Sequence, residues 1–341
     1  MHQCTPPLLI NGFFIFMTRD EIPESIYAYI RQRLLLRLGC GLRQFSLAPV
    51  QAGVHSRVFC LDIEGEQPLI LKVIPKRERF RSIIRCSRFL AQKGVSVPDI
   101  IDACEDNRFF NRRGMHILCE AKICGETLQQ AERSPELIRS IARFFLRMHA
   151  TTRKTWGSID KGKSSGLFAY LHEKTECRMA AWSAADASMS ASLQNRIRET
   201  FARGKAVVDH MSVFSLSHCD PNPGNIILRS SDREFFLLDP GTIRFMPRAI
   251  EYFMLQAYFC FHTKENISVF ETAYLHQLSG PELQEFTDSQ SFFRLYVVVL
   301  FMHDLTTRFV NIGSDNPYHD EFLALIPQAK KVLMELLDAK G

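Results

Sequence analysis

The segment 217–241, SHCDPNPGNIILRSSDREFFLLDPG, constrains the fold of this chain more than any other stretch. Two short apolar runs, 226–228 and 235–238, flank a polar turn, and this pattern predicts a β-hairpin. A hairpin folds back on itself, so the residues that flank its two strands lie close together. Asn225 precedes the first run and Asp239 follows the second, and we therefore expect them to be neighbours.

The polar residues of this segment predict a metal site and a base. His218, Asp220 and Asn225 follow the spacing H-x-D-x-x-x-x-N. Carboxylate and amide oxygens are hard ligands that suit Mg²⁺, which usually keeps waters and substrate phosphates in its shell. We predict that Asn225 and Asp239 bind the metal, which leaves Asp220 free to accept a proton from an alcohol. The alternative is that these residues only cap turns.

Composition limits the class of protein. A chain of 341 residues can form one large domain or two lobes around a cleft. Its net charge of +5 is too small to indicate nucleic-acid binding, although it suits nucleotides or an anionic membrane surface. The ten cysteines show no C-x-x-C spacing, so we predict no zinc site, no disulfide framework and a cytoplasmic location. No apolar run is long enough to form a transmembrane segment.

The first part of the chain predicts a helix and then strands. Residues 1–40 are expected to form an extension with an amphipathic helix over 21–38, and Met17 is an alternative start. Residues 45–63 alternate like two strands around a turn, in which Gly53 allows the backbone to approach a ligand closely.

A lysine on the next strand predicts an anionic ligand. The segment 68–75, PLILKVIP, places Ile70, Lys72 and Ile74 on one face. A lysine between two isoleucines on a buried face is unfavourable unless it meets an anion. The alternative is a lysine at a strand edge with its ammonium group in water.

Helical periodicity dominates the rest of the chain. A basic helix is expected over 77–93, and a strand over 115–120 leads into CEAKICGETL. Further helices are predicted over 134–149, 167–179, 193–211, 247–262, 267–277, 281–286, 292–309 and 321–337. After Gly241 we expect helices only.

Four residues in order resemble the catalytic and nucleotide-binding residues of protein-kinase-like enzymes: Lys72, Asp220, Asn225 and Asp239. The segment with Pro-Gly before the asparagine is most similar to the aminoglycoside phosphotransferase and choline kinase branch, to which lipopolysaccharide-core sugar kinases are related. The resemblance covers roughly residues 45–310. It implies an α+β, bilobal, protein-kinase-like fold, with a β-rich N-lobe over 41–122, which carries the nucleotide-binding sheet, and a mostly helical C-lobe over 123–341, which carries the catalytic loop and acceptor pocket.

The resemblance also implies roles for residues. Asp220 is the expected catalytic base, and Asn225 and Asp239 are the expected ligands of Mg²⁺. The nucleotide-binding residues that it implies are Gly53, Ser56, Ile70, Lys72, Glu120 and Lys122, where the last two act through their backbone at the adenine edge. Lys72, Asn225 and Asp239 are expected to converge on one crevice between the lobes, with Asp220 at its mouth.

One departure from the family concerns the helix after Lys72. Enzymes of this type usually place a glutamate there to pair with the strand lysine. This helix instead carries Arg79, Arg81, Arg85 and Arg88, and its only acid is Glu78, near its start. Either Glu78 pairs with Lys72, or Lys72 is oriented differently. Glu251 stands where the family often has a structural aspartate.

The function implied is transfer of the γ-phosphate of ATP or GTP to a hydroxyl of a small molecule, a sugar or an amino alcohol. Other candidate acceptors are a lipopolysaccharide-core sugar, an antibiotic and a protein serine. Two alternatives stay open. A nucleotide-binding pseudokinase would fit the missing helix glutamate, and a protein-interaction module would bind no nucleotide.

Overall fold

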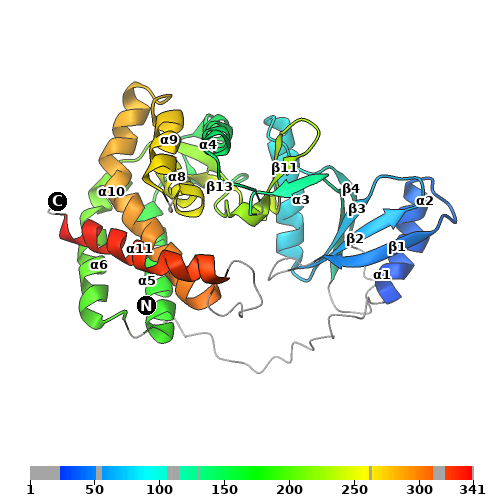
Figure 1. Cartoon of the computed structure of the whole chain (residues 1–341), viewed down its shortest axis with the longest axis horizontal. Coiled ribbons are helices and arrows are strands. Elements are labelled where there is room, and N and C mark those ends of the chain that lie inside the picture. Colours follow the sequence, from blue (N-terminus) through cyan, green and yellow to red (C-terminus); the bar gives the residue numbers. More distant parts are fainter. Residues whose placement is uncertain are drawn as a thin grey trace. The chain divides into compact units, whose positions relative to one another are not determined.

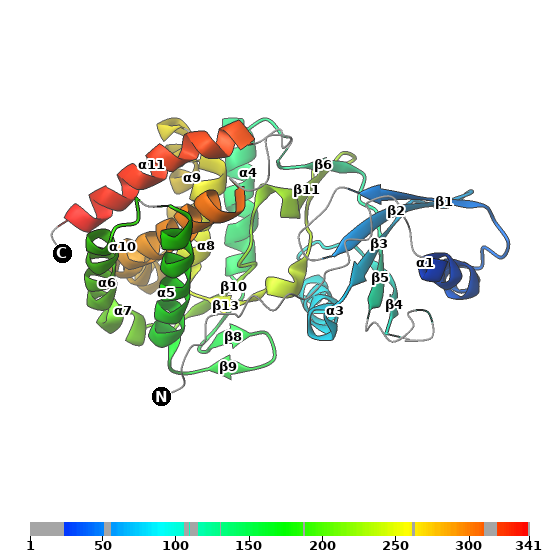
Figure 2. The same cartoon turned by 90° about the horizontal axis from the view of Figure 1, so that it is seen from below.

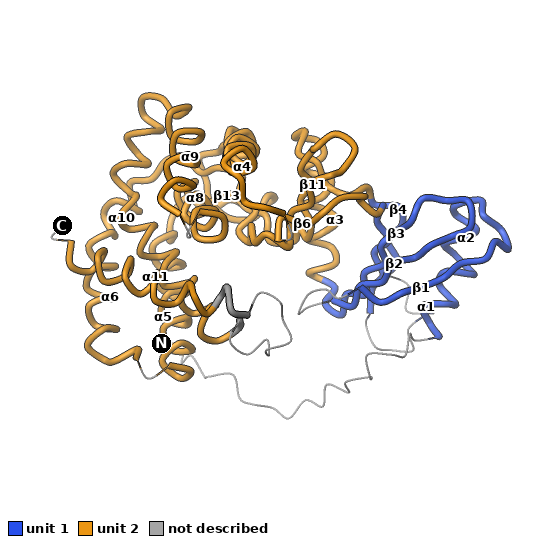
Figure 3. The backbone as a smooth tube through the Cα atoms, in the orientation of Figure 1, with its two compact units in different colours: residues 1–77, 100–121 blue, residues 78–99, 122–341 orange. Residues whose placement is uncertain are grey.

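The computed structural model describes residues 24–50, 56–105, 109, 115–129, 131–186, 188–260, 263–309 and 319–339 (Figure 1). The chain forms two compact units (Figure 3). Unit 1 comprises residues 1–77 and 100–121, and unit 2 comprises residues 78–99 and 122–341. The mixed α+β composition, with a sheet-rich N-terminal region and a helical C-terminal region, confirms the predicted fold class. The predicted boundaries of the extension and the lobes stay a prediction.

Unit 1 is built on a five-stranded antiparallel sheet in the order β1-β2-β3-β5-β4. Its strands are β1 (Phe45–Val50), β2 (Arg57–Ile63), β3 (Leu69–Ile74), β4 (Ile100–Cys104) and β5 (His116–Ala121). Side chains alternate along a strand, so Leu69, Leu71 and Val73 of β3 enter the core of the unit. Ile70 and Lys72 therefore share the other face, where both are half-buried.

The N-terminal helical segment packs on this unit through a buried carboxylate. The segment comprises α1 (Glu24–Tyr29), the π-helix η1 (Ile30–Leu34) and α2 (Leu35–Arg37), where the sequence predicts one helix. Asp102 of β4 accepts hydrogen bonds from the Tyr29 hydroxyl at 2.9 Å, from Arg33 Nε at 2.7 Å and from Arg37 Nη1 at 2.9 Å. Arg33 and Arg37 thus pair with the sheet.

Unit 2 contains two small sheets. One has the order β12-β11-β6, with β6 (Gly125–Thr127), β11 (Ile226–Arg229) and β12 (Phe235–Leu237). The other has the order β7-β10-β13-β8-β9, with β7 (Thr152–Arg153), β8 (Trp156–Ser158), β9 (Gly162–Lys163), β10 (Phe214–Ser217) and β13 (Arg244–Met246). The expectation of helices only after Gly241 is wrong, because β13 pairs with β10 and β8. Strands of three residues are too short to show a period.

Helices make up most of unit 2 (Figures 1 and 2). They are α3 (Arg77–Gln92), α4 (Pro135–His149), α5 (Leu167–Ala185), α6 (Ala191–Arg203), α7 (Lys205–Asp209), α8 (Arg248–Leu255), η5 (Gln256–Cys260), α9 (Lys264–Leu275), α10 (Gly280–His303), η6 (Asp304–Phe309) and α11 (His319–Asp338), together with the short 3₁₀ turns η3 (Pro223–Asn225) and η4 (Pro240–Thr242). None of the helices in the described ranges is long and apolar enough to cross a membrane.

The two helices predicted over 281–286 and 292–309 are one continuous helix, α10, followed by η6. The polar stretch between them does not interrupt the backbone. Ser289 is buried, and its hydroxyl donates to the Glu285 carbonyl at 2.7 Å, one turn earlier. Because the Ser289 hydroxyl finds its hydrogen-bond partner within α10, this polar residue does not end the helix.

Candidate active site

The predicted hairpin is present and brings Asn225 next to the residue before Asp239. β11 and β12 pair antiparallel, with Ile226 opposite Leu237. Beyond this pair, the Leu238 amide donates to the Asn225 carbonyl at 2.8 Å. The third strand, β6, packs so closely that a Cβ on Gly125 would lie 2.3 Å from the Leu228 carbonyl oxygen, which explains the glycine at this position.

Asp220 lies in the loop between β10 and β11, and two asparagines hold its carboxylate. Asn222 Nδ2 donates to Oδ1 at 3.1 Å, and Asn225 Nδ2 donates to Oδ2 at 3.2 Å and to the Asp220 carbonyl at 3.0 Å. Asn222 in turn accepts from the Gly224 amide at 3.0 Å. These bonds fix the orientation of Asp220, which is half-buried. Sequence analysis missed Asn222, although an Asn-Pro-Gly turn is typical of a side chain that caps its own loop.

A buried glutamate anchors the start of this loop. Glu251 of α8 is fully buried, and its carboxylate accepts from the His218 amide at 3.0 Å and from the Cys219 amide at 2.9 Å. His149 Nε2 lies 2.9 Å from the same carboxylate, and Tyr274 bonds the other ring nitrogen. Burial lowers the pKa of His149, although the neighbouring Glu251 acts in the opposite direction. Burial thus favours the neutral imidazole. The sequence signal for Glu251 was an acid within a strongly apolar helix.

Two further bonds tie the loop to the end of the hairpin. The His218 ring, through Nε2, donates to the Leu238 carbonyl at 2.9 Å, and the Thr242 hydroxyl donates to the His218 carbonyl at 2.8 Å. Asp239 adopts the left-handed conformation with φ of 47°, and Cys219 has φ of 63°. Such backbone is unfavourable for residues with a side chain and persists only where the surroundings enforce it. The loop and the residue after the hairpin are therefore held as one rigid group.

Asp239 pairs with the start of helix α3. Its carboxylate accepts a hydrogen bond from Arg79, and the neighbouring Ser82 hydroxyl donates to the Gly241 carbonyl at 3.1 Å. Arg79, one of the four arginines of this helix, therefore pairs with a carboxylate of the protein itself. A Cβ on Gly241 would lie 2.9 Å from Ile83, so the glycine permits this close packing.

The donor set of this group fits Mg²⁺. Within the described ranges, no group of three or more His, Cys, Asp and Glu residues is placed to hold a metal. Asn225 and Asp239 offer one amide oxygen and one carboxylate, and the Asn225 amide nitrogen is already turned toward Asp220. A site with two protein ligands is typical of Mg²⁺, which takes its other ligands from phosphates and water.

Lys72 lies in unit 1 and pairs with a strand residue. Its Nζ lies 2.6 Å from Glu120 Oε2, and the side chains are 13% and 3% exposed. Lys72 is opposite Leu118 and Ile70 is opposite Glu120, so the two charged side chains share one face of neighbouring strands, in diagonal positions. The partner that the helix lacks is therefore on β5. Sequence analysis assigned Glu120 a role for its backbone only and missed this contact of its side chain.

The other predicted nucleotide-binding residues occupy the following places. Ser56 precedes β2 and is half-buried, and Ile70 is half-buried on β3. Lys122 follows β5 and is exposed. Gly53 lies outside the described residues. Unit 2 thus brings Asp220, Asn225 and Asp239 together, whereas the convergence of Lys72 with them stays a prediction.

Comparison with known families gives a match over most of the chain. The model of the phosphotransferase enzyme family, APH, matches residues 46–284. A search of curated protein sequences found no match.

Solved structures share the fold. The aminoglycoside phosphotransferase APH(4)-Ia superposes with a TM-score of 0.62 and 13% identity, covering 93% of this chain and 99% of its own. A Plasmodium vivax ethanolamine kinase gives a TM-score of 0.61 and 13% identity, with 93% and 91% covered. A putative aminoglycoside phosphotransferase from Ralstonia eutropha gives 0.61 and 15%, with 93% and 99% covered. At these identities the likeness concerns the fold.

Proposed function

We propose that the acceptor of this chain, which belongs to the phosphotransferase enzyme family and is an ATP-dependent kinase, is a hydroxyl group of a small molecule such as a sugar. The observation that carries the proposal is the single hydrogen-bonded group formed by Asp220, Asn225 and the backbone next to Asp239. It combines an oriented carboxylate with a metal-compatible oxygen pair, which is what phosphoryl transfer to an alcohol requires.

In the proposed reaction, Asp220 accepts the proton of the acceptor hydroxyl. The hydroxyl oxygen forms a bond to the γ-phosphorus, the bond from that phosphorus to the bridging oxygen breaks, and the nucleoside diphosphate leaves with the electron pair. Asn222 and Asn225 hold the two carboxylate oxygens of Asp220, so the base meets its substrate in a fixed orientation. Positioning of this kind supplies much of the acceleration in phosphoryl transfer.

The charges of the nucleotide need cations. Mg²⁺ held by Asn225 and Asp239 would neutralise charge on the phosphates. Lys72 is proposed to bind the α- and β-phosphates, with Gly53 and Ser56 at the phosphates, Ile70 at the adenine, and the backbone of Glu120 and Lys122 at the adenine edge. ADP and hygromycin B in one aminoglycoside phosphotransferase complex support this pairing of nucleotide and hydroxylated acceptor.

Asp220→Asn tests the base. The variant keeps the shape of the side chain but cannot accept the proton, so we expect turnover to fall by about 10²- to 10⁴-fold while Mg-ATP still binds. The measurement is ADP release in a coupled assay, together with calorimetric titration of Mg-ATP. Asp209→Asn is the matched control, because Asp209 is exposed on α7 and pairs with Lys205, away from the proposed site residues in the sequence. Near-normal turnover of Asp220→Asn contradicts its role as the base.

Nucleotide binding separates the alternatives. A ligand present at about a hundred times its dissociation constant stabilises a protein by about 2.7 kcal/mol. A protein-interaction module predicts no thermal shift with Mg-ATP, and a pseudokinase predicts a shift without transfer to any acceptor. The Lys72–Glu120 pair favours an active enzyme over a pseudokinase, because the lysine has a carboxylate partner after all.

A further inference from the structure

One arginine beside the proposed catalytic loop, Arg244, forms no ion pair with the carboxylates in the part of the chain that the structure describes. Arg244 begins β13 and is opposite Ser217, the residue that precedes the loop. Its charge acts on the loop itself. Burial, Glu251 and Asp220 raise the pKa of the Cys219 thiol, and Arg244 opposes them. Arg244 therefore lies near the residue that adjoins the proposed base.

The hydrogen bonds of Arg244 leave part of its guanidinium unused. Nη1 donates to the Tyr170 hydroxyl at 3.0 Å and Nε donates to the Thr242 carbonyl at 3.3 Å. Both acceptors are neutral, and Arg244 forms no ion pair with a carboxylate of the described residues. A half-buried guanidinium is unfavourable without an anion, and its planar donors match a carboxylate or a phosphate.

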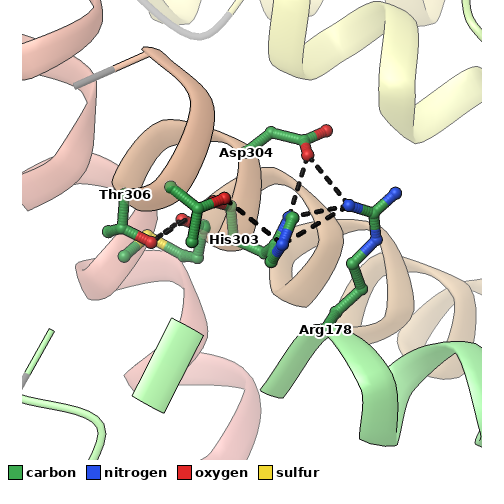
Figure 4. Close-up of polar contacts among 6 residues, drawn as sticks. Arg178, His303, Asp304 and Thr306 are labelled. Carbon is green, nitrogen blue, oxygen red and sulfur yellow. Dashed lines mark hydrogen bonds and ion pairs between the residues drawn. The ribbon is translucent and has the colours of Figure 1, made fainter. Parts of the chain in front are cut away.

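A second arginine nearby shows the contrast. Arg178, on the same helix as Tyr170, donates to Asp304 at 3.3 Å and to the ring of His303 at 2.9 Å (Figure 4). Burial raises the pKa of Tyr296, and both arginines oppose that rise, so both act on the same neighbourhood. Arg178 pairs with a carboxylate, whereas Arg244 has no such partner within the described ranges.

The surroundings add positive charge and aromatic surface. The β8–β9 hairpin lies at the start of α5 (Figure 2), where the Trp156 and Tyr170 rings are 5.2 Å apart. Lys163 lies 5.1 Å from the Trp156 ring, and Lys174 lies 5.7 Å from the Tyr170 ring. Of the described acids that act here, Asp160 pairs with Arg85, and Glu251 accepts from the loop amides. Glu173 is exposed, and Asp220 is the proposed base. A cationic acceptor would meet like charges on this side.

We propose that the acceptor carries an anionic group, a carboxylate or a phosphate, and that Arg244 binds this group while Asp220 receives the hydroxyl proton. The inference rests on the proposed phosphotransfer and names its substrate class: a hydroxylated small molecule with a negative charge. Arg244 is a specificity residue in this scheme, and Tyr170 holds it in place.

Four compounds with one ring skeleton test the charge preference: glucose, glucosamine, glucuronate and glucose 6-phosphate. We expect the wild type to release ADP with kcat/KM at least about tenfold higher for one or both anionic compounds than for the other two. Reaction of glucuronate would identify a carboxylate as the anionic group, and reaction of glucose 6-phosphate would identify a phosphate. In Arg244→Gln this preference should fall by about ten- to a hundredfold, because charge-assisted hydrogen bonds are lost. Arg196→Gln, on α6 and paired with Asp338, should keep the preference.

If none of the four compounds is phosphorylated, they are compared as ligands by thermal shift in the presence of Mg-ADP. Stabilisation of the wild type by the anionic pair only, lost in Arg244→Gln, supports the inference. Equal stabilisation by all four, or none by the anionic pair, overturns it. Mg-ATP alone is titrated in parallel. No shift there removes the proposed function itself, whereas a shift without charge preference removes only the anionic acceptor.

Discussion

The two ion pairs that involve proposed nucleotide-site residues differ in depth. Lys72 and Glu120, in unit 1, join neighbouring strands, and their side chains are 13% and 3% exposed. Arg79 and Asp239, in unit 2, join a helix start to a loop, and their side chains are 27% and 31% exposed. Breaking a buried pair leaves an unpaired charge in low dielectric, whereas an exposed pair exchanges partners at little free-energy change.

The difference suggests two tasks. In the proposed site, the strand pair would hold the Lys72 ammonium in one orientation, and the more exposed pair would release the Asp239 carboxylate to Mg²⁺. The missing helix glutamate then has a simple physical explanation. A carboxylate on β5 already orients Lys72, so the start of α3 is free to carry an arginine.

Glu120→Gln should have the largest effect. It leaves the Lys72 ammonium without its counter-ion, and we expect unfolding free energy to fall by about 3 kcal/mol and KM for ATP to rise at least about tenfold. Chemical denaturation and steady-state kinetics measure the two. Glu66→Gln, which breaks an exposed pair with Arg43 in the same unit, is the matched control.

A double variant separates structure from binding. Lys72→Met with Glu120→Leu replaces the pair by apolar side chains, which often restores stability. Stability should recover and ATP turnover should not. Two results would show that Glu120 does not orient Lys72. One is a wild-type KM for ATP in Glu120→Gln, and the other is an equally large rise of this KM in Glu78→Gln.

The His149–Glu251 pair is fully buried but lies in unit 2. It therefore tests whether the burial of a pair, rather than the unit that contains it, determines how much the pair contributes to the free energy of unfolding. Burial lowers the folded pKa of His149 below its unfolded value of about 6.5. Between the two values the unfolded chain binds the proton and the folded chain does not. The contribution of His149 to the free energy of unfolding is therefore fully present above about pH 6.5. It decreases as the pH falls, by at most about 1.4 kcal/mol per pH unit.

Thermal unfolding between pH 7.5 and pH 5 measures this slope. His149→Gln keeps a donor toward Glu251 but does not titrate, so its slope should be shallower than that of the wild type. His172→Gln, on the exposed face of α5, should leave the slope unchanged. The same slope in wild type and His149→Gln would assign the pH dependence to another group.

Arg79→Gln should have the smallest effect on stability, below about 1 kcal/mol. Because Arg79 and Mg²⁺ would compete for the Asp239 carboxylate, affinity for Mg-ATP should rise, by up to about fivefold in calorimetry. Arg85→Gln, on the same helix and paired with Asp160, is the control. A fall in affinity would instead make Arg79 a ligand of the nucleotide.

The proposed catalytic segment was predictable because its contacts are local in the sequence. Short stretches of sequence predict the hairpin, the spacing of Asp220 and Asn225, and the position of Asp239 after the second strand. The contacts among these residues join positions that are close in the sequence. The strand β13 escaped prediction because its three residues gain their pairing only from β10 and β8. α10 was predicted as two helices because Ser289 and its polar neighbours hide a continuous helix.

By itself the sequence determined the class of the chain, the order of its proposed catalytic residues and the strand that carries Lys72. Only the tertiary structure decided the partners of those residues: Glu120 for Lys72, Arg79 for Asp239, Glu251 for the loop amides and none for Arg244 among the described carboxylates. The reason is that a pattern along the chain records which side chains share a face, whereas charge pairing depends on which distant elements pack together.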